Sequence, residues 1–316
     1  MIQKNSAILG LLAQTSIHAG TGQQIGFIDL PIQREGHSGW PCIFGSSVKG
    51  ALRTNAEQKK IEYLKSNGTV IQTQEEYAEK VQNSEDIAVV FGPSTNNASD
   101  HAGALIVSDA KLLLMPVRSL TSHFKWVTCP YGLTRYQQDC LRLGIAGQSF
   151  KVPPVNDSEA LVHVTATEDS LFLEEYRFQT KRIDFNQGPI KALSNLMTME
   201  NATDLLRTQL VLVSNNSFVH LVNHTTPVNA HIAIETQTKT VKEGALWYEE
   251  TLPPETLLYV SLFANDARNG NSSMPAETIL GMATNLFSER PWLQVGGNET
   301  VGMGWCGVKT LSQEGV

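Results

Sequence analysis

Short apolar runs, separated by polar and glycine-rich stretches, predict strands and helices at both ends of the chain. Residues 7–15 are almost continuously apolar, which is typical of a strand buried on both faces. Pro31 and Pro41 predict irregular backbone up to Gly45. Ser46 or Ser47 is a suitable N-cap, and the pattern that follows predicts an amphipathic helix reaching Leu64.

The rest of the chain alternates in the same way and predicts an α+β fold over residues 1–316 as a single domain. Strands are expected at 104–107, 111–117, 171–177, 210–222, 255–264 and 301–309, and helices at 133–143, 190–199 and 275–289. The polar stretch 66–100 predicts an insertion outside the core. Together with the end of the preceding helix, the expected insertion covers residues 54–102. Residues 227–245 alternate polar and small apolar side chains, which predicts an exposed β-hairpin within a 205–250 region.

Composition excludes several classes of protein. The 316 residues are 41% hydrophobic and 17% charged, typical of a globular protein with a real core. The longest apolar stretches are far shorter than the roughly 18 to 20 residues that span a bilayer, so no membrane association is expected. Lys4 and the apolar residues 7–13 imitate a signal peptide only faintly. The cysteines form no disulfide or zinc pattern, so we expect a cytoplasmic protein with buried thiols at Cys42, Cys129, Cys140 and Cys306.

The net charge of −7 argues against a protein that coats nucleic acid through a global positive field. Residues 31–66 nevertheless carry six basic and three acidic side chains, a local balance of +3 against −10 elsewhere. We therefore expect a basic inner groove and acidic outer surfaces.

The segment Gly45-Ser-Ser-Val-Lys-Gly-Ala-Leu-Arg53 offers the groups that a phosphate requires. A helix start provides free N–H groups, and the segment adds hydroxyls, a glycine and two cations, at Ser46, Ser47, Lys49, Gly50 and Arg53. The alternative is an ordinary capped helix with solvated basic residues. A second alternative is the Ser-x-x-Lys pattern of penicillin-recognising serine acyltransferases, at Ser46 and Lys49, although Lys-Thr-Gly and Ser-Asp-Asn elements are missing.

Other candidate residues are less specific. The glycine-rich loop 296–304 could bring backbone N–H groups to a phosphodiester through Gly296, Gly297, Gly302 and Gly304, or it is a flexible turn. Asp29 and His18 lie in predicted loops, where a turn or structural role is the alternative. Glu249 and Glu250 precede two prolines and are expected at the exposed end of the hairpin region. His220, His224 and His231 give only weak evidence for a metal site.

Ordered motifs carry a more specific resemblance. These are His18-Ala-Gly-Thr-Gly, Ile28-Asp-Leu-Pro-Ile-Gln-Arg-Glu35, the segment 39–53, Tyr248-Glu-Glu-Thr-Leu-Pro-Pro-Glu-Thr-Leu-Leu-Tyr259 and the loop 296–304. Together they resemble the backbone subunits of type III-B (Cmr) CRISPR effector complexes, which belong to the RAMP superfamily. Residues 67–201 carry no motif that we can place.

The resemblance implies a fold and a function. The expected fold is an RRM-like, ferredoxin-type palm with helical insertions and a protruding β-hairpin thumb. Copies of the chain would stack along a guide CRISPR RNA with other Cmr subunits, and would cleave the complementary target RNA at regular intervals. A purely structural, non-catalytic RNA-binding subunit is the alternative.

The resemblance also implies roles for particular residues. Asp29 corresponds to the family's loop aspartate, which acts with a divalent metal ion (Mg or Mn), bound transiently through ligands that remain unknown. His18 and either Glu249 or Glu250 are secondary catalytic candidates; Thr251 stands where some relatives have an aromatic residue. Guide RNA phosphates are assigned to the helix start, the glycine-rich loop and two residues beside Asp29, namely Gln33 and Arg34.

Overall fold

Four strands and two helices form a palm with the topology of an RRM. In a computed structural model, which describes residues 5–23, 26–93, 101–268 and 272–313, the central strand order is β14-β1-β12-β4. β1 (Ser6–Ala13) is antiparallel to both β12 (Leu257–Ala264) and β14 (Trp305–Ser312). α1 (Gly45–Ser66) lies between β1 and β4 (Ala110–Val117) in the chain, and α8 (Ala276–Thr284) lies between β12 and β14. This β-α-β-β-α-β order confirms the predicted ferredoxin-type palm.

Further strands extend the sheet on both sides. Short strands flank the palm: β2 (Cys42–Ile43), β3 (Leu105–Val107) and β13 (Trp292–Gln294). Beyond β4 the order continues through β5 (Lys125–Thr128), β9 (Leu210–Val213), β6 (Glu159–His163), β8 (Tyr176–Ile183) and β7 (Ser170–Leu173). The other helices are α2 (Gln74–Tyr77), α3 (Glu85–Phe91), α4 (Pro130–Arg142), α5 (Lys191–Ser194), α6 (Ala202–Gln209) and α7 (Asn215–His224). Single turns of π-helix (Ala78–Gln82, Asn186–Ile190) and 3-10 helix (Asn285–Phe287, Glu299–Val301) complete the described elements.

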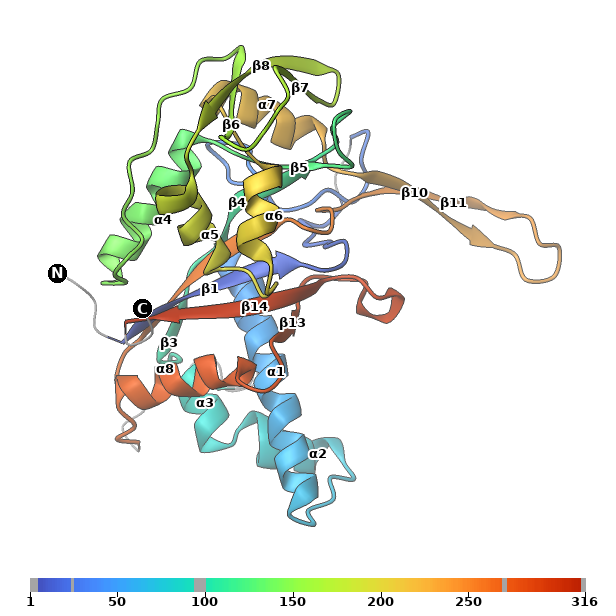
Figure 1. Ribbon diagram of the computed structural model, residues 1–316. Helices are drawn as coiled ribbons and strands as arrows, with labels where there is room; N and C mark the ends of the chain where they lie inside the picture. Colours follow the sequence, from blue (N-terminus) through green and yellow to red (C-terminus); the bar gives the residue numbers. More distant parts are fainter. Residues whose placement is uncertain (1–4, 24–25, 94–100, 269–271, 314–316) are drawn as a thin grey trace.

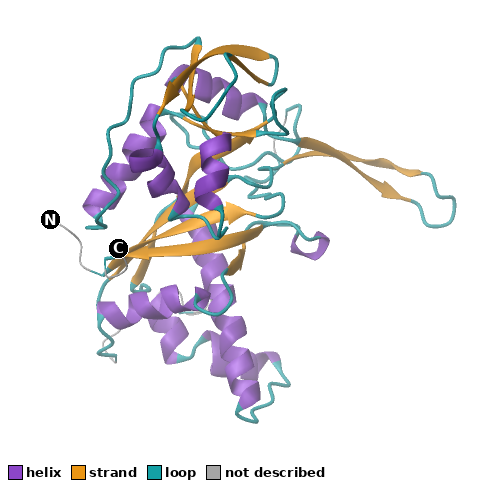
Figure 2. Cartoon of the chain, in the orientation of Figure 1, coloured by secondary structure: helices purple, strands orange, loops and turns teal. Residues whose placement is uncertain are grey.

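Helices cover both faces of the palm (Figure 2). Every residue of β1 is buried, as predicted, and alternate side chains enter two different cores. Leu9 and Leu11 pack with Val48 of α1, whereas Ile8 and Leu12 belong to the core that contains α4 and α6. A Cβ on Gly10 would lie 2.2 Å from the carbonyl oxygen of Leu196, so the chain after α5 lies directly on this sheet face. RNA therefore has no access to the face that an RRM ordinarily uses.

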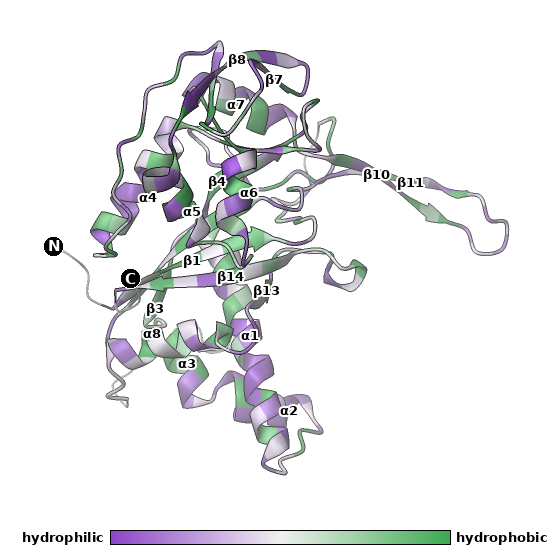
Figure 3. Cartoon of the chain, viewed as in Figure 1, coloured by the Kyte–Doolittle hydropathy of each residue, from purple (hydrophilic) through white to green (hydrophobic). Residues whose placement is uncertain are grey.

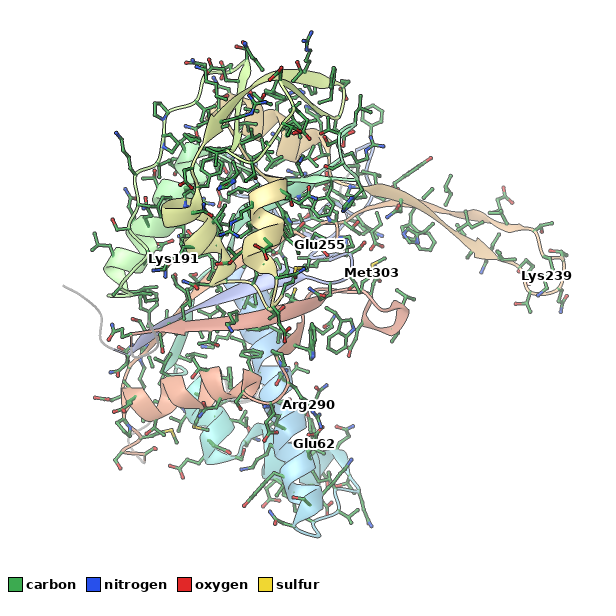
Figure 4. All side chains as sticks on the ribbon, in the orientation of Figure 1. Glu62, Lys191, Lys239, Glu255, Arg290 and Met303 are labelled. Carbon is green, nitrogen blue, oxygen red and sulfur yellow. The ribbon has the colours of Figure 1, made fainter. Side chains whose placement is uncertain are left out.

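The hairpin leaves the body as a long arm. β10 (Val228–Ile234) and β11 (Val241–Glu250) form a separate two-stranded sheet and project away from the palm (Figure 1). Lys239 marks the tip (Figure 4). This confirms the exposed hairpin, although the first part of the 205–250 region, through α7, belongs to the body.

Several local predictions were wrong. The expected strand 171–177 is divided between β7 and β8, because the chain turns at Glu174 and Glu175. Residues 210–222 are not one strand, because Ser214 ends β9 and caps α7 by accepting a hydrogen bond from the Ser217 N–H. Neither Ser46 nor Ser47 is the N-cap, since α1 begins at Gly45 after Phe44 and the Asp109 carboxylate accepts the Gly45 N–H at 2.7 Å. The predicted insertion also contributes to the core, because residues 87–91 of α3 are buried against α1 and the palm. No helix within the described ranges is both long and apolar enough to cross a membrane.

Candidate functional site

The base of the hairpin receives the loop that carries Asp29. The Leu30 N–H donates to the Tyr248 carbonyl at 3.1 Å, and the Glu250 N–H donates to the Leu30 carbonyl at 3.0 Å. One carboxylate oxygen of Asp29, Oδ2, accepts the Tyr248 N–H at 2.7 Å. Residues 219 positions apart are therefore joined, and the half-buried Asp29 side chain is fixed where the thumb leaves the palm.

His18 and Glu249 meet just below this junction. The His18 Nδ1 lies 2.8 Å from the Glu250 carbonyl oxygen and 3.5 Å from Oε1 of Glu249. A carbonyl oxygen can only accept, so Nδ1 carries the proton of this hydrogen bond. Asn298 donates its side-chain amide to Oε1 of Glu249. Two candidate groups for proton transfer are thus held side by side, and the glycine-rich loop touches both, since Gly297 donates its N–H to the His18 carbonyl at 2.8 Å.

The Glu250 side chain lies on the opposite face of β11 from Glu249, and its carboxylate accepts several hydrogen bonds. Its carboxylate accepts the Ile32 N–H at 3.1 Å, the Thr226 hydroxyl at 2.6 Å and an Arg34 guanidinium N–H at 2.6 Å. Glu249 and Glu250 are only 4% and 3% exposed, so the prediction that they form the exposed end of the hairpin was wrong. Alternation along β11 separates the two carboxylates: Glu249 reaches the site, and Glu250 holds the thumb to the body.

A polar groove lies between the loop that follows His18, the first turns of α1 and the glycine-rich loop. Its volume is about 390 Å³, and its lining residues are all uncharged: Ala19, Gly20, Gln33, Ser47, Ala51, Thr54, Gln294, Gly296 and Gly297. Gln33 is anchored there, because its Oε1 accepts the Phe44 N–H at 2.6 Å and its Nε2 donates to Gly20 and Ser47. Gly296, at φ +88°, must be glycine, since a Cβ would lie 2.5 Å from the His18 carbonyl oxygen.

The basic residues of α1 do not face this groove. Lys49 Nζ donates to the Leu105 carbonyl at 2.8 Å, and burial lowers the pKa of its ammonium group. Arg53 binds Glu57 and the carbonyl oxygens of Gln82, Gly92 and Pro93. The face of α1 that lines the groove carries Ser47, Ala51 and Thr54 instead. The expected arrangement of two cations beside the glycine-rich loop, and with it the basic inner groove, was therefore wrong.

The structure also shows where the other predicted site residues lie and what they contact. Arg34 uses its guanidinium on Glu250, Thr226, Asn223 and backbone carbonyl groups, so it is bonded within the fold. Ser46 is exposed, and because Lys49 donates to Leu105, the pair does not form the nucleophile and base of a serine acyltransferase. Gly50 lies on the exposed side of α1, and Gly302 lies at the outer end of the glycine-rich loop. Gly304 approaches Val295 and donates its N–H to Ser16.

A preformed metal site does not fit the described residues. Within the parts of the chain that the structure covers, no three histidine, cysteine, aspartate or glutamate side chains converge as metal ligands. His220 and His224 lie side by side with ring centroids 4.5 Å apart, but His231 is on the hairpin, stacked on Trp247. At the hairpin junction the Glu250 carboxylate is bound by Arg34 and the Glu249 carboxylate by Asn298, which leaves Asp29 with too few partners for a cage made of protein groups.

Sequence reasoning missed Asn298 as an individual residue, although it singled out the loop that contains it. It also missed two exposed aromatic residues as individual candidates: Phe27, two positions before Asp29, and Tyr248, whose backbone N–H binds the Asp29 carboxylate. The only local signal was an apolar residue within a polar loop. Tyr248 becomes relevant through its strand pairing, which no sequence motif announces.

The palm topology, the glycine-rich loop and the hairpin define a class of protein. The profile of the RAMP superfamily matches residues 11–307, and the chain belongs to that superfamily. It is 33% identical over 303 residues to "CRISPR system Cmr endoribonuclease Cmr4" of Pyrococcus furiosus, covering 95% of this chain and 94% of the relative. A second relative, "CRISPR system CMR subunit Cmr4" of Saccharolobus solfataricus, is 26% identical over 95% of this chain and 94% of its own length.

Solved structures agree with this assignment. Oligomeric Cmr4 from Pyrococcus furiosus superposes with a TM-score of 0.66 at 26% identity, over 97% of each chain. A subunit of the type III-B Cmr-beta complex bound to cognate target RNA has the same TM-score over 98% of each chain. Because that subunit is only 19% identical, its similarity supports the fold alone.

Proposed function

We propose that this chain is a guide-RNA-binding backbone subunit of a type III-B CRISPR effector complex and the endoribonuclease that cuts the complementary target RNA. The relative that is 33% identical over nearly the whole chain bears the name of an endoribonuclease of this system. The observation that carries the proposal is the Asp29 carboxylate, fixed at the base of the thumb next to His18 and Glu249.

The polar groove suits the backbone of the guide. Its lining combines amide, hydroxyl and backbone groups with glycines that allow close approach, and these groups bind phosphate and ribose without reading bases. The absence of basic side chains from this lining fits a binding site that is repeated along one strand, since each copy need contribute only part of the affinity. Sequence is then read by base pairing between guide and target.

The thumb suits the separation of neighbouring bases. Its aliphatic face is exposed over the length of the arm and carries Ile232, Ile234, Val241 and Leu246. Such a surface has no partner within the described chain, and apolar side chains inserted between bases unstack them. A target strand opened in this way would pass Asp29 at the base of the arm, once for every copy of the subunit.

The protein's main task in cleavage is to position the RNA, because the RNA supplies its own nucleophile. The 2′-OH next to the scissile bond attacks the phosphorus in line, a 2′,3′-cyclic phosphate forms, and the 5′-oxygen leaves with a proton. In the proposed site His18 and Glu249 serve the proton transfers, and Asp29 orients the strand. We also propose that Asp29 is the residue that would hold a transient Mg²⁺ or Mn²⁺ ion, which would stabilise the negative charge of the phosphate.

The proposed setting is the cytoplasm, with copies of this chain and other Cmr subunits assembled on one guide RNA. The four cysteines are free and buried, which suits a reducing compartment. Burial raises the pKa of the Cys42 thiol to about 12, so this thiol stays protonated and unreactive.

Target cleavage by the assembled complex tests the proposal. Asp29→Asn keeps the shape of the side chain but removes its charge, and we expect cleavage to fall by about 100-fold or more while guide and target binding stay within twofold. Asp169→Asn, in the exposed bend just before β7, is the matched control. Full binding without cleavage in wild type would make the chain a structural subunit, the alternative favoured by the bond that Asp29 already makes to the Tyr248 backbone.

A further inference from the structure

Asn298 joins the glycine-rich loop to the base of the thumb. Its side-chain amide donates to Oε1 of Glu249, the same oxygen that lies 3.5 Å from Nδ1 of His18. The next residues toward the N-terminus, Gly296 and Gly297, line the polar groove. Asn298 therefore contacts the carboxylate proposed to act on the target and directly follows the last glycine of the loop that lines the groove proposed to hold the guide.

The backbone around Asn298 is arranged to present this amide. Asn298 is left-handed, at φ 62° and ψ 28°, a conformation that asparagine tolerates better than most side chains. Its carbonyl oxygen accepts the N–H groups of Val301 and Met303, and its amide also lies 3.7 Å from the Met303 sulfur. Met303 is labelled in Figure 4, close to where the thumb leaves the body. The loop thus folds around the side chain rather than leaving it in solvent.

Glu249 depends on this contact because it is buried. With 4% exposure its carboxylate has little water, and a buried carboxylate needs donors. The other groups facing this region are His18 from the loop after β1, Asp29 across the strand pairing, and the Arg34–Glu250 pair on the opposite face of β11. Arg34 is occupied by Glu250, and the Nδ1 of His18 is shared with the Glu250 carbonyl.

We propose that Asn298 is a positioning residue of the ribonuclease centre, holding the Glu249 carboxylate oriented toward His18 while the glycine-rich loop is docked. The inference rests on the proposed function and extends it, since it couples the groove to the site of cleavage. Asn298 acts through Glu249 and does not itself contact the reacting phosphate.

The test uses the complex assembled with guide RNA, matched target and divalent metal. Asn298→Asp keeps the shape of the side chain and the left-handed backbone but replaces the donor with a second carboxylate. Asn298→Gly keeps the backbone conformation and removes the amide without adding charge. We expect both to slow cleavage by about tenfold or more, with guide binding within twofold. Glu299→Gln, an exposed neighbour in the same loop, should cleave at the wild-type rate.

A double-mutant cycle separates positioning from general support of the fold. In a Glu249→Ala background, where cleavage is slower but measured over longer times, Asn298→Asp should have no further effect. An equal effect in both backgrounds would overturn the inference. So would wild-type cleavage by Asn298→Asp, or a loss of guide binding in proportion to cleavage. If instead wild type does not cut, or Asp29→Asn cuts normally, the proposed function fails and not the role of Asn298 alone.

Discussion

Charged residues near the site divide into those that hold the fold together and those left for chemistry. Arg34 and Glu250 form a largely buried pair, with Nη2 and Oε1 2.6 Å apart. The pair ties the Asp29 loop to the start of the thumb, because Thr226 donates to the same carboxylate oxygen. Arg34 therefore supports the geometry of the site rather than providing a free cation for RNA.

Replacing Arg34 tests this role. Arg34→Ala leaves the Glu250 carboxylate buried without its counter-ion, so we expect the free energy of unfolding to fall by about 3 kcal/mol. Urea denaturation measures the change, with Arg177→Ala on exposed β8 as a control expected to change stability by less than about 0.5 kcal/mol. Unchanged stability together with weaker RNA binding would restore Arg34 as an RNA contact.

Glu255 gives a prediction on pH. Its backbone is left-handed, at φ 69°, one carboxylate oxygen is buried without a partner, and burial raises the pKa of the carboxyl group above 4.5. The folded state then binds more protons than the unfolded state, so wild type loses stability as pH rises above about 4.5. Glu255→Gln should be more stable than wild type at pH 7, and the difference should disappear below pH 4.5. A constant difference at all pH values would contradict this account.

Some residues near the site could be predicted from the sequence, and others could not. Asp29, His18 and Gln33 could be singled out from motifs, because loops with glycine and polar residues are short and local. The pairing of Arg34 with Glu250 could not be predicted, since 216 positions separate them and only the fold brings them together. The same reason explains why Lys49 and Arg53 were assigned to RNA: apart from Glu57, one turn after Arg53, their partners are backbone carbonyl oxygens of distant segments.

Among the elements of the site, the glycine-rich loop contains glycines that are needed for different structural reasons. Gly302 and Gly304 both have positive φ, +84° and +87°. A Cβ on Gly304 would lie 2.2 Å from the Val295 carbonyl oxygen, whereas a Cβ on Gly302 would meet nothing within 4 Å. One glycine therefore allows a close backbone approach, and the other allows only a turn.

Alanine at each position separates the two effects. Gly302→Ala should cost about 1 kcal/mol of stability, the price of a left-handed alanine. Gly304→Ala adds a clash with backbone and should cost clearly more, about 3 kcal/mol. Thermal unfolding of the two variants provides the comparison, and equal losses would contradict the geometry of the loop.

The thumb gives the opposite expectation, a change of function with little change of stability. Ile232 and Leu246 are cross-strand partners, 48% and 54% exposed. Replacing both with serine should lower stability by about 1 kcal/mol or less and reduce target cleavage, because bases are no longer wedged apart. Gln237→Ser at the polar tip is the control. Wild-type cleavage by the double variant would exclude the aliphatic face from base displacement.

Elements with a clear local pattern were predicted well. β1 is one continuous apolar run, α1 buries Val48, Leu52 and Glu57 and no residue after them, and exposed and less exposed positions alternate toward the base of the hairpin. The apolar stretch 210–222 was misassigned because a strand and a helix follow each other without a break in hydrophobicity, and only Ser214 marks the boundary. Polar residues around α3 similarly concealed its buried face.

For the whole molecule, the RRM-like palm serves as a support and not as an RNA-reading sheet. Figure 3 shows hydrophobic segments on strands at the centre and a larger share of hydrophilic residues toward the far end of α1. Because helices bury both sheet faces, RNA contacts are left to the loops at one end of the palm and to the arm. The order of strands could be anticipated only through the resemblance, since pairings such as β1 with β12 join residues about 250 positions apart.

Mapping the ends of target RNA fragments at single-nucleotide resolution tests the central claim most directly. The complex should be assembled with wild-type chain or with Asp29→Asn, and supplied with guide RNA, matched target and divalent metal. The account predicts regularly spaced cuts for wild type, with 2′,3′-cyclic phosphate ends, and none for the variant despite equal target binding. The same cuts at the same rate from Asp29→Asn would contradict it.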